Sequence, residues 1–504
     1  MAAQSLQTLL SDAQRPARFT LEAGALQADF SRQKIDSEVI TRLCDWARAS
    51  GFEQDREDLF AGRIVNPTED RPALHPALRG VCGAPALTAE IEAQHDETAA
   101  LATRLREGAL KGFRGTPLRA LVCLGIGGSD LGPRLVVDAL KEADAFDVRF
   151  VANVDPDELA RELIGLNPET TAFALISKTF TTRETLANAD AARRWLIAGG
   201  CPSEVVAEHL IGVSAAVEAT RAQGIRPDRL LSFHEGVGGR YSLWSAVGLG
   251  IAVACGPAVH AALRAGAAEI DRHFRDHPLE SNLPAWVGLI SVWNRAFLGM
   301  PTQALVPYSE RLRLLPAWAQ QLVMESNGKS VQRDGHPVTL PTAPVYWGSS
   351  GTPAQHSYFQ QLHQGPDRVP VDFILAAQSS STPGSPTDDR QRILLANGLA
   401  QAAALALGRA APEGDPHRHF PGDRPSTVFM LKRVEARSLG ALLAVYEHAT
   451  FTAACVLGIN PFDQFGVEYG KVLASDIERL LAGTPVTGLD PATLASAQRL
   501  TALR

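Results

Sequence analysis

A turn rich in hydroxyl side chains follows the apolar run at 171–177 and leads into a segment with helical character from about Glu184. Its polar residues are Ser177, Lys178, Thr179, Thr181 and Thr182. Hydroxyl donors, one ammonium and the amides of a helix N-terminus all favour negative charge, so this turn suits a phosphate dianion. The alternative that the turn alone leaves open is that the hydroxyls only cap the helix.

A second stretch, QQLVMESNGKS, carries a carboxylate that could act as a base. Gln321 and Glu325 are four residues apart and share one face if the stretch is helical. Apolar neighbours at 322–324 indicate partial burial, which would suit Glu325 to proton abstraction. An ordinary glutamate at a helix end is the competing interpretation.

Two glycine turns offer bare backbone and an arginine. LGIGGSDLGPRL at 124–135 contains Gly128 and Ser129, and its amides could cradle a phosphate or a sugar. Its spacing fits neither a dinucleotide fingerprint, nor GxSxG, nor a P-loop, and a tight turn without a ligand stays possible. In GVGGRYSLWSAVGLGIA at 236–252, Arg240 could stabilise an oxyanion or simply pair with a carboxylate.

Two further segments carry residues that can pass protons to and from oxygen atoms. WGSSGTPAQHSYFQQLHQG places His356 and His363 seven residues apart, which is a helical spacing. NPFDQFGVEYGKVLAS places Gln464 and Lys471 at the same spacing. Taken singly, each of these is more often a structural residue.

The elements that must position these residues alternate between strand-like and helix-like runs from Leu118 onward. Short apolar runs followed by turns or helical segments are typical of a parallel sheet covered by helices. The strand candidates are RALVCL, VRFVANV, TAFALIS and DRLLSF, and then, beyond a Pro/Gly/Asp-containing break at 275–302, QALVPYS, VPVDFILAA and PSTVFMLKRV. The pattern therefore predicts two successive α/β units.

The flanking regions have a different character. Residues 1 to about 115 are predicted to be helical without a strand, and the tail from Phe451 is again helical. The stretch SSSTPGSPTDD at 379–389 is predicted to be a surface loop.

Composition narrows the function classes. The net charge of −7 and pI near 6.0 give no general positive field for nucleic acid or an anionic membrane. The N-terminus lacks the features of a signal peptide and there is no continuous apolar run of 18 residues, so we expect a cytoplasmic protein with no membrane partner. The six cysteines form no CxxC pair, and His417 and His419 have no recognisable third ligand, so no metal site or disulfide framework is predicted.

Taken together and in this order, the segments resemble the glucose-6-phosphate isomerase family, also called the phosphoglucose isomerase family. The likeness begins with NPTEDRPALHPALRG at 66–80 and spans most of the chain. It continues through GIGGSDLGP, SKTFTTRET, GGRYSLWSAVGL, MESNGKS, GTPAQHSYFQQLHQG and FDQFGVEYGK. GGRYSLWSA and FDQFGVEYGK are its most specific parts.

The resemblance implies reversible isomerisation of glucose 6-phosphate and fructose 6-phosphate through ring opening and an enediolate, without a metal or cofactor. Its implied fold is α/β, with two sugar-isomerase-type, doubly wound, mainly parallel sheets flanked by helices and with helical N- and C-terminal extensions. The implied domains are a helical segment at 1–104 packing on the larger domain, a smaller domain at 105–253, and a larger domain at 254–504 with a helical tail.

Family roles carry over where the motifs match. The implied phosphate ligands are Ser177, Lys178, Thr179 and Thr182, with Gly128 and Ser129 on the sugar side. Arg240 would stabilise the enediolate, and Glu325 would move the proton between C1 and C2. In metal-dependent isomerases a divalent ion stabilises the negative charge of the enediolate. Here Arg240 would take that role.

The remaining implied roles concern substrate placement and ring opening. Gln321 and Gln464 would position the substrate, while His356 and Lys471 would assist ring opening. The family pattern is a homodimer in which the histidine comes from the partner subunit. The sequence departs from the family in WGSSGTPAQHS before His356 and in SFHEGV before the GGR motif, but every residue assigned a chemical role is present.

Two other functions stay open at this point. A sensing module that binds a sugar phosphate without catalysis would be expected to lack Glu325, Arg240 or His356, and none is missing. A related isomerase that also accepts mannose 6-phosphate would need extra freedom at C2, which the residues near Glu325 do not decide.

Overall fold

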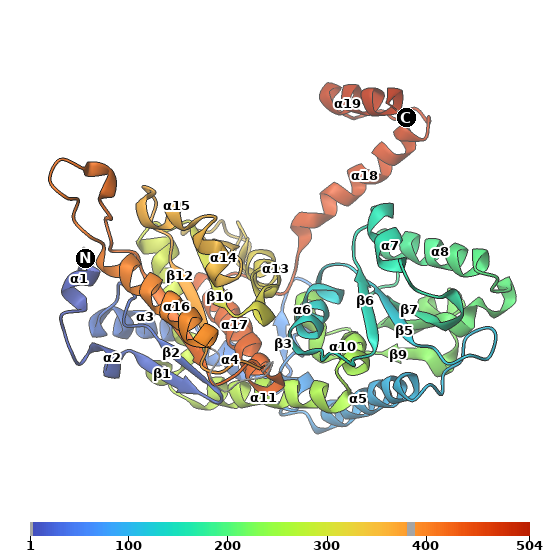
Figure 1. Cartoon of the computed structure of the whole chain (residues 1–504), viewed down its shortest axis with the longest axis horizontal. Helices are drawn as coiled ribbons and strands as arrows, with labels where there is room; N and C mark the ends of the chain where they lie inside the picture. Colours follow the sequence, from blue (N-terminus) through green and yellow to red (C-terminus); the bar gives the residue numbers. More distant parts are fainter. Residues whose placement is uncertain (1–3, 381–388, 504) are drawn as a thin grey trace. The chain divides into compact units, whose positions relative to one another are not determined.

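The computed structural model describes residues 4–380 and 389–503. It divides into two units, Met1–Pro461 and Phe462–Arg504, which are described separately below. The strands of the first unit form two larger sheets and a small hairpin, β3 (Ile64–Asn66) with β4 (Arg71–Pro72). Figure 1 shows the sheets with helices against their faces.

The first sheet is entirely parallel, in the order β6-β5-β7-β8-β9. Its strands in chain order are β5 (Ala120–Leu124), β6 (Asp147–Val151), β7 (Thr171–Ile176), β8 (Leu210–Ser214) and β9 (Leu230–Ser232). Strand β5 and strand β7 are neighbours, although the chain visits the β6 edge between them. From the junction between β5 and β7, the sheet therefore extends to β6 on one side and to β8 and β9 on the other.

The second sheet has the order β1-β2-β13-β12-β10-β11. Its strands are β1 (Thr20–Ala23), β2 (Leu26–Asp29), β10 (Thr302–Tyr308), β11 (Val345–Trp347), β12 (Val371–Ala376) and β13 (Ser426–Leu431). The last four pair in parallel, whereas β1 and β2 form an antiparallel hairpin that pairs with β13.

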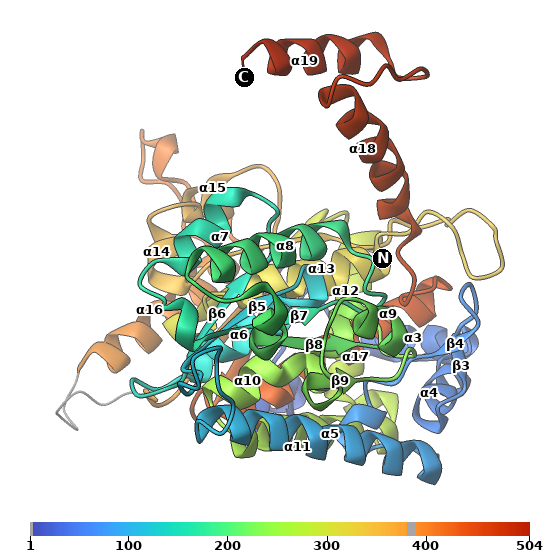
Figure 2. The same ribbon diagram turned by 90° about the vertical axis from the view of Figure 1, so that its right-hand side faces the viewer.

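Helices cover both faces of the first sheet. In Figures 1 and 2, α7 and α8 lie on one face and α10 lies on the other. The core beneath α7 and α8 joins Val122 and Phe173 of the sheet to Leu159 and Leu196 of the helices. The helices of this region are α5 (Pro85–Arg106), α6 (Leu131–Leu140), α7 (Pro156–Leu163), α8 (Arg183–Ala198), α9 (Val217–Ala222) and α10 (Leu249–Ala254).

The second sheet is likewise enclosed. Val306 and Phe373 pack against Phe359 and Leu405 of the helices on one side, and Phe429 contacts Tyr446 of α17. The helices of this region are α11 (Pro257–Asp276), α12 (Leu283–Val292), α13 (Leu315–Asn327), α14 (Gly351–Gln355), α15 (Phe359–Gln364), α16 (Asp389–Leu407) and α17 (Ala436–Leu457). The predicted α/β class with two mainly parallel, helix-flanked sheets is confirmed.

Within residues 4–380 and 389–503, one helix, α17, is long and apolar enough to cross a membrane by length and composition, and its apolar stretch is completely buried within the fold. It packs beside α11 and α12, and it carries the buried polar residues Glu447 and His448.

The N-terminal region differs from the sequence-based prediction of helix without strand. It contains the helices α1 (Leu6–Leu9), α2 (Arg15–Arg18), α3 (Ser37–Ala49) and α4 (Phe52–Ala61), but also β1 to β4. The prediction of no strand is therefore wrong, because β2 completes the second sheet by pairing with β13. The surface loop predicted at 379–389 lies largely outside the described residues. The domain boundaries at 104 and 253 remain a prediction.

The second unit contains a one-turn helix, η12 (Phe465–Val467), followed by α18 (Glu468–Leu481) and α19 (Pro491–Ala502). The predicted helical character of the tail is confirmed. Helix α18 has no buried residue in the described structure, and the apolar side chains of Tyr469 and Val472 are exposed.

Candidate active site

The carboxyl ends of β5 and β7 meet where the strand order of the first sheet reverses. Ligands of open α/β sheets bind in the crevice that forms at such a reversal. The glycine turn beginning at Gly125 follows β5, and the hydroxyl-rich turn beginning at Ser177 follows β7. The two turns are close, because a Cβ on Gly125 would stand 3.2 Å from the carbonyl oxygen of Ile176. The topology thus brings together two of the segments singled out in the sequence.

The glycine turn also contacts the segment that carries Arg240. A Cβ on Gly128 would stand 1.9 Å from the carbonyl oxygen of Gly239 and 2.6 Å from the amide nitrogen of Arg240. Only glycine permits this approach of two backbones. Gly127 has a left-handed φ of 61°, and its Cβ position lies 2.9 Å from Nε2 of Gln321. The turn is therefore packed between two other predicted site segments.

Glu325 lies at the centre of these contacts. Its Oε2 accepts a hydrogen bond from Nε2 of Gln321 at 2.9 Å and lies 3.4 Å from Nη1 of Arg240. The two partners of this ion pair differ in burial, since the Arg240 side chain is 2% exposed and that of Glu325 is 23% exposed. Both Gln321 and Glu325 lie on α13, as their spacing predicted. The carboxylate of Glu325 thus lies beside the Arg240 guanidinium and stays partly open to solvent, so it can reach a bound substrate.

Buried partners that the sequence analysis did not single out hold the arginine. Nε of Arg240 donates to Oγ of Ser326 at 2.7 Å, and Nη2 donates to the carbonyl oxygen of Pro461. Oγ of Ser326 also makes a 3.1 Å hydrogen bond with Oη of Tyr241. The available signal was adjacency, because Tyr241 and Ser326 directly follow Arg240 and Glu325 in the chain.

The hydroxyl-rich turn is internally ordered. Oγ of Ser177 forms a 3.1 Å hydrogen bond with Oγ1 of Thr182 and accepts from the amide of Phe180 at 3.1 Å. Phe180 is buried with a φ of 54°, which is uncommon for a residue other than glycine. Thr179 is exposed and pairs with Thr181 at 2.8 Å. Helix α8 begins immediately after this turn, at Arg183, close to the predicted start.

Lys178 supplies the positive charge of the turn. Burial lowers the pKa of Lys178, and the nearby Arg71 acts in the same direction, whereas Glu69 and Glu235 oppose it. Glu69 and Arg71 belong to the 66–80 motif, to which the sequence analysis gave no chemical role. A phosphate dianion beside the ammonium would favour its charged form and oppose the effect of burial.

His356 is exposed at the end of α14. The helical spacing of His356 and His363 is interrupted, because the chain leaves α14 at His356 and starts α15 only at Phe359. His363 instead forms a 2.7 Å hydrogen bond with Oε1 of Gln401. His363 thus has a structural role, whereas His356 is exposed on a separate segment.

Gln464 and Lys471 belong to the second unit, Phe462–Arg504. Gln464 immediately precedes η12, and Lys471 lies on the exposed surface of α18. Their helical spacing is interrupted, because Gln464 is the N-cap residue of η12 and lies outside α18. The structure brings Gly128, Ser129, Ser177, Lys178, Thr182, Arg240, Gln321 and Glu325 into adjoining segments of the first unit.

Behind Trp244, the segment after Arg240 is anchored by a fully buried charged cluster. Arg79 donates to both carboxylate oxygens of Asp271, at 2.7 and 2.6 Å, and also to Glu447. Glu447 in turn accepts from Nε1 of Trp244 at 2.8 Å. Burial raises the pKa of Glu447 to about 7, with Arg79 and Trp244 opposing that rise. Removing one partner from such a cluster leaves an uncompensated buried charge.

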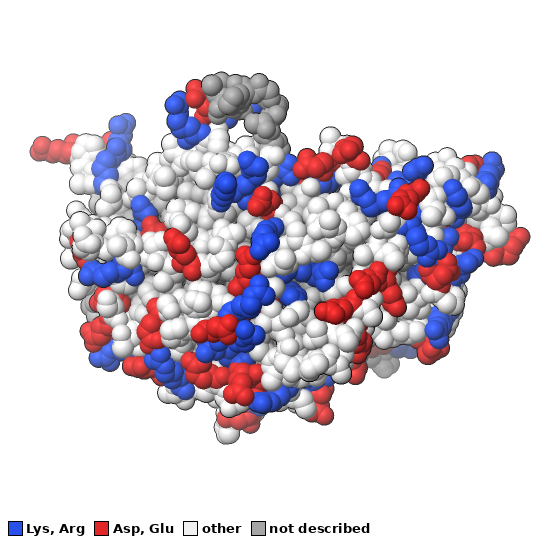
Figure 3. Space-filling model, turned by 90° about the horizontal axis from the view of Figure 1, so that it is seen from below, with Lys and Arg blue, Asp and Glu red and all other residues white. Residues whose placement is uncertain are grey.

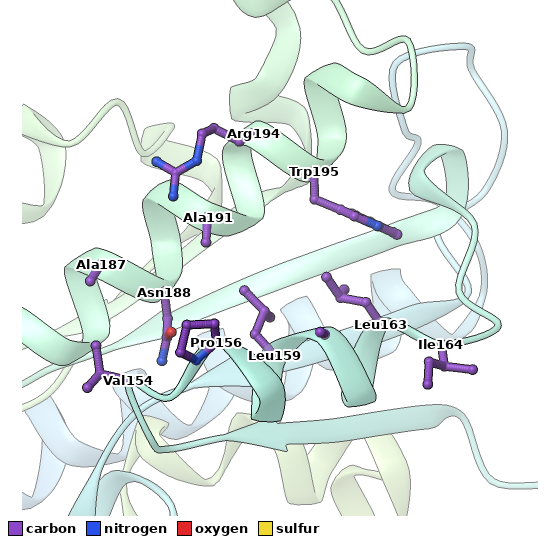
Figure 4. Close-up of a pocket in the computed structure, with 11 residues that line it drawn as sticks. Val154, Pro156, Leu159, Leu163, Ile164, Ala187, Asn188, Ala191, Arg194 and Trp195 are labelled. Carbon is purple, nitrogen blue, oxygen red and sulfur yellow. The ribbon is translucent and has the colours of Figure 1, made fainter. Parts of the chain in front are cut away.

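A different kind of cavity lies between α7 and α8. It has a volume of about 680 Å³ and an apolar lining that includes Leu159, Leu163 and Trp195, with Asn188 and Arg194 at its polar edge (Figure 4). Its described lining contains none of the residues predicted for catalysis or phosphate binding. The candidate site is therefore defined by the polar segments at the sheet reversal.

The face of the molecule shown in Figure 3 does not point to a separate binding site for an anion. There, Lys and Arg side chains are interspersed with Asp and Glu side chains. Among the described residues, no cluster of three or more His, Cys, Asp or Glu side chains suited to a metal ion is found.

Comparison with known proteins gives a consistent result. A family model described as phosphoglucose isomerase matches residues 29–496. Glucose-6-phosphate isomerase of Burkholderia cenocepacia is 46% identical over 491 residues, covering 95% of this chain and 90% of the relative. The corresponding protein of Paraburkholderia xenovorans is 45% identical over 485 residues, covering 94% and 89%.

A solved structure extends the comparison to the fold. The crystal structure of a glucose-6-phosphate isomerase from Chlamydia trachomatis superposes with a TM-score of 0.87 at 31% identity. The match covers 100% of this chain and 96% of the chlamydial chain. The arrangement of both sheets is thus shared with that protein.

Proposed function

The chain belongs to the phosphoglucose isomerase family, and from this premise we propose how its residues carry out the reaction. The protein is an isomerase that interconverts glucose 6-phosphate and fructose 6-phosphate, a step of glycolysis that also runs in gluconeogenesis. Its substrate is therefore a hexose phosphate. The proposal concerns which side chains bind that substrate and which move its protons.

The phosphate group is held by Ser177, Lys178, Thr179 and Thr182, with Gly128 and Ser129 facing the sugar. The position of both turns at the strand-order reversal supports this assignment. The amides that open α8 add favourable dipoles to the ammonium of Lys178. Anchoring the phosphate fixes the distance at which the reacting carbons of the open chain lie from α13.

Glu325 removes the proton from one of the two carbons C1 and C2 and returns it to the other. The observation that carries this proposal is the contact of Glu325 with both Arg240, at 3.4 Å, and Gln321, at 2.9 Å. As the proton leaves, negative charge develops on the substrate oxygen, and the Arg240 guanidinium stabilises it electrostatically. Gln321 holds the carboxylate and lies against the glycine turn.

Ring opening requires a proton to leave one sugar oxygen and another to arrive. We assign these transfers to His356 and Lys471, with Gln464 positioning the sugar. The exposure of His356 at the end of α14 is compatible with its reaching the site of a second copy in a homodimer. We also place the protein in the cytoplasm, which is supported by six cysteines that are all free thiols.

The test is isomerisation of fructose 6-phosphate in the presence of a chelator. We expect full activity there, and Glu325→Gln should lower turnover at least ~100-fold, the lower end of the effect of losing a general base. Glu310→Gln, the same substitution at an exposed glutamate in the turn just before α13, is the control for the changed charge. Near-normal turnover of Glu325→Gln would remove Glu325 from the role of base.

The sensing module without catalysis that the sequence left open is set aside, because Arg240, Glu325 and His356 are all present. Whether mannose 6-phosphate is also accepted is a separate question, because it depends on extra freedom of the substrate at C2. Measuring turnover of all three hexose phosphates with the same preparation distinguishes these cases, because a sensor would convert none of them.

A further inference from the structure

Ser326 lies at a branching point of hydrogen bonds beneath the proposed catalytic pair. Its Oγ accepts from Nε of Arg240 at 2.7 Å and bonds to Oη of Tyr241 at 3.1 Å. All three residues are buried, with exposed fractions of 0% for Ser326, 1% for Tyr241 and 4% for Arg240. Water therefore cannot readily replace the serine hydroxyl as a partner of the guanidinium.

The tyrosine has its own support. The ring of His75 stacks on the ring of Tyr241, with centroids 4.7 Å apart and an interplanar angle of 26°. Burial raises the pKa of Tyr241 to about 12, so its hydroxyl keeps its proton at neutral pH. Burial, with help from Arg79 and His448, lowers the pKa of His75, so the stacked ring is neutral. The stack can thus hold Tyr241 without adding a charge beside the guanidinium.

These contacts fix the direction of the arginine. A guanidinium is planar, and its donors point in fixed directions. Nε is directed at Ser326, Nη2 at the carbonyl oxygen of Pro461, and Nη1 faces Glu325. Because the guanidinium is planar and rigid, the hydrogen bonds of Nε and Nη2 determine where Nη1 points. Rotation of the guanidinium would break a buried hydrogen bond before Nη1 could turn away from Glu325.

We propose that Ser326, supported by Tyr241 stacked on His75, is a positioning residue that aims the Arg240 guanidinium at the charge of the transition state. The proposal rests on the proposed role of Arg240. It also gives a role to His75 in the 66–80 motif, whose residues had no chemical assignment. Because Ser326 follows Glu325 in α13, one helix turn would hold the base and set the direction of its cationic partner.

A role in aiming a charge differs measurably from a role in folding. Two competitive inhibitors share the phosphate and differ in charge near the reacting carbons: a five-carbon sugar-acid phosphate, whose carboxylate stands in for the enediolate, and a hexitol 6-phosphate, which is neutral there. In Ser326→Ala we expect binding of the acid to weaken at least ~10-fold, as for a lost hydrogen bond to a charged group, and binding of the hexitol to change less than about 2-fold. Turnover should fall while KM stays nearly constant.

Matched variants separate the possible outcomes. Tyr241→Phe keeps the ring stack and loses only the hydroxyl, so it should show the same charge selectivity to a smaller extent. Ser245→Ala is the control, because Ser245 is buried in the same segment but donates to the carbonyl oxygen of Ser242. It should not discriminate between the inhibitors.

Equal weakening of both inhibitors by Ser326→Ala, or no weakening, would overturn the positioning role, and Tyr241→Phe decides in the same way if Ser326→Ala does not fold. Arg240→Lys tests the premise separately. If Arg240→Lys fails to weaken the acid selectively, the role proposed for Arg240 fails; if only the Ser326 and Tyr241 variants fail to do so, the positioning inference alone is wrong.

Discussion

Among single residues, Arg240 would act in the proposed mechanism on two negative charges that alternate during the reaction. Before proton transfer the charge is on Glu325, and afterwards it is on the enediolate. A guanidinium 3.4 Å from the carboxylate can interact with both charges without moving far. Its buried partners keep the reorganisation small, and small reorganisation is the main benefit of a preformed electrostatic site.

The proposed phosphate site gives a prediction about a single side chain. Replacing Lys178 by Met removes the ammonium but keeps a chain of similar length, so binding of the dianion should weaken. The loss of one charge-assisted interaction is worth about 1.5–3 kcal/mol, so we expect KM for fructose 6-phosphate to rise at least ~10-fold. Steady-state kinetics measure it.

Lys141→Met is the matched control, because Lys141 is exposed at the end of α6 and lies outside the site segments. It should leave KM unchanged. An unchanged KM in Lys178→Met, with correct folding shown by circular dichroism, would contradict the phosphate role of that lysine.

The sequence was enough to find the residues whose side chains are chemically active. It was not enough to find the residues that hold those side chains in place. Glu325 and Arg240 stand out by type and setting. Ser326 and Tyr241 are ordinary polar residues whose role depends on a contact between segments 85 positions apart. No local pattern records such a contact, and only the fold creates it.

At the scale of elements, the crossing of α11 and α17 depends on two glycines. A Cβ on Gly440 would stand 1.9 Å from the carbonyl oxygen of Leu263, and a Cβ on Gly266 would stand 1.9 Å from that of Arg437. Gly440→Ala should therefore destabilise the protein by ~1–3 kcal/mol through overpacking. The measurement is the thermal midpoint.

Gly470→Ala serves as the control for helix propensity. Gly470 lies within α18 and its Cβ position has no neighbour within 4 Å. This change should be neutral or should favour the helix by up to ~1 kcal/mol. A Gly440→Ala variant as stable as the parent would show that the two helices can move apart at little cost.

A pH prediction concerns β12 in the second sheet. Burial raises the pKa of Asp372 to about 7, although hydrogen bonds from Tyr446 and Gln303 oppose the rise. The other titratable group that faces it is Tyr346, whose pKa burial also raises. Between the ordinary pKa of about 4 and about 7, only the native state holds the proton. The stabilisation is fully present below about pH 4 and is lost as the pH rises through about 7.

Asp372→Asn removes this titration and keeps a side chain of the same shape. Relative to the variant, the parent should lose stability as the pH rises from about 5 to about 7, with a slope of at most about 1.4 kcal/mol per pH unit. Thermal midpoints of both proteins across this range measure the difference. Parallel curves would contradict a protonated Asp372.

Most parallel strands could be predicted from their apolar runs, and the missed strands have physical reasons. Strand β8 contains Gly212, which weakens a strand pattern. Its glycine is needed because a Cβ there would stand 2.5 Å from the side chain of Thr220. Strands β1 and β2 are four residues long and contain Leu, Ala, Glu and Gln, which favour helices in isolation. Pairing with β13 overrides that preference.

At the scale of the whole molecule, the proposed homodimer has a consequence that a single chain cannot show. If His356 acts in the site of the partner subunit, each site combines Glu325 of one chain with the partner's His356. Glu325→Gln and His356→Ala would each be inactive as homodimers. A hybrid of the two would contain one site with both defects and one site with none.

Mixing the two inactive variants in equal amounts and allowing subunits to exchange should therefore restore activity. Random exchange makes half of the dimers hybrid, each with one intact site of two, so about a quarter of the parent activity should return. Mixing without exchange is the control, and it should restore nothing. If exchange is demonstrated by a mass label and activity stays absent, each site takes its histidine from its own chain, because every site of the hybrid then keeps one defect.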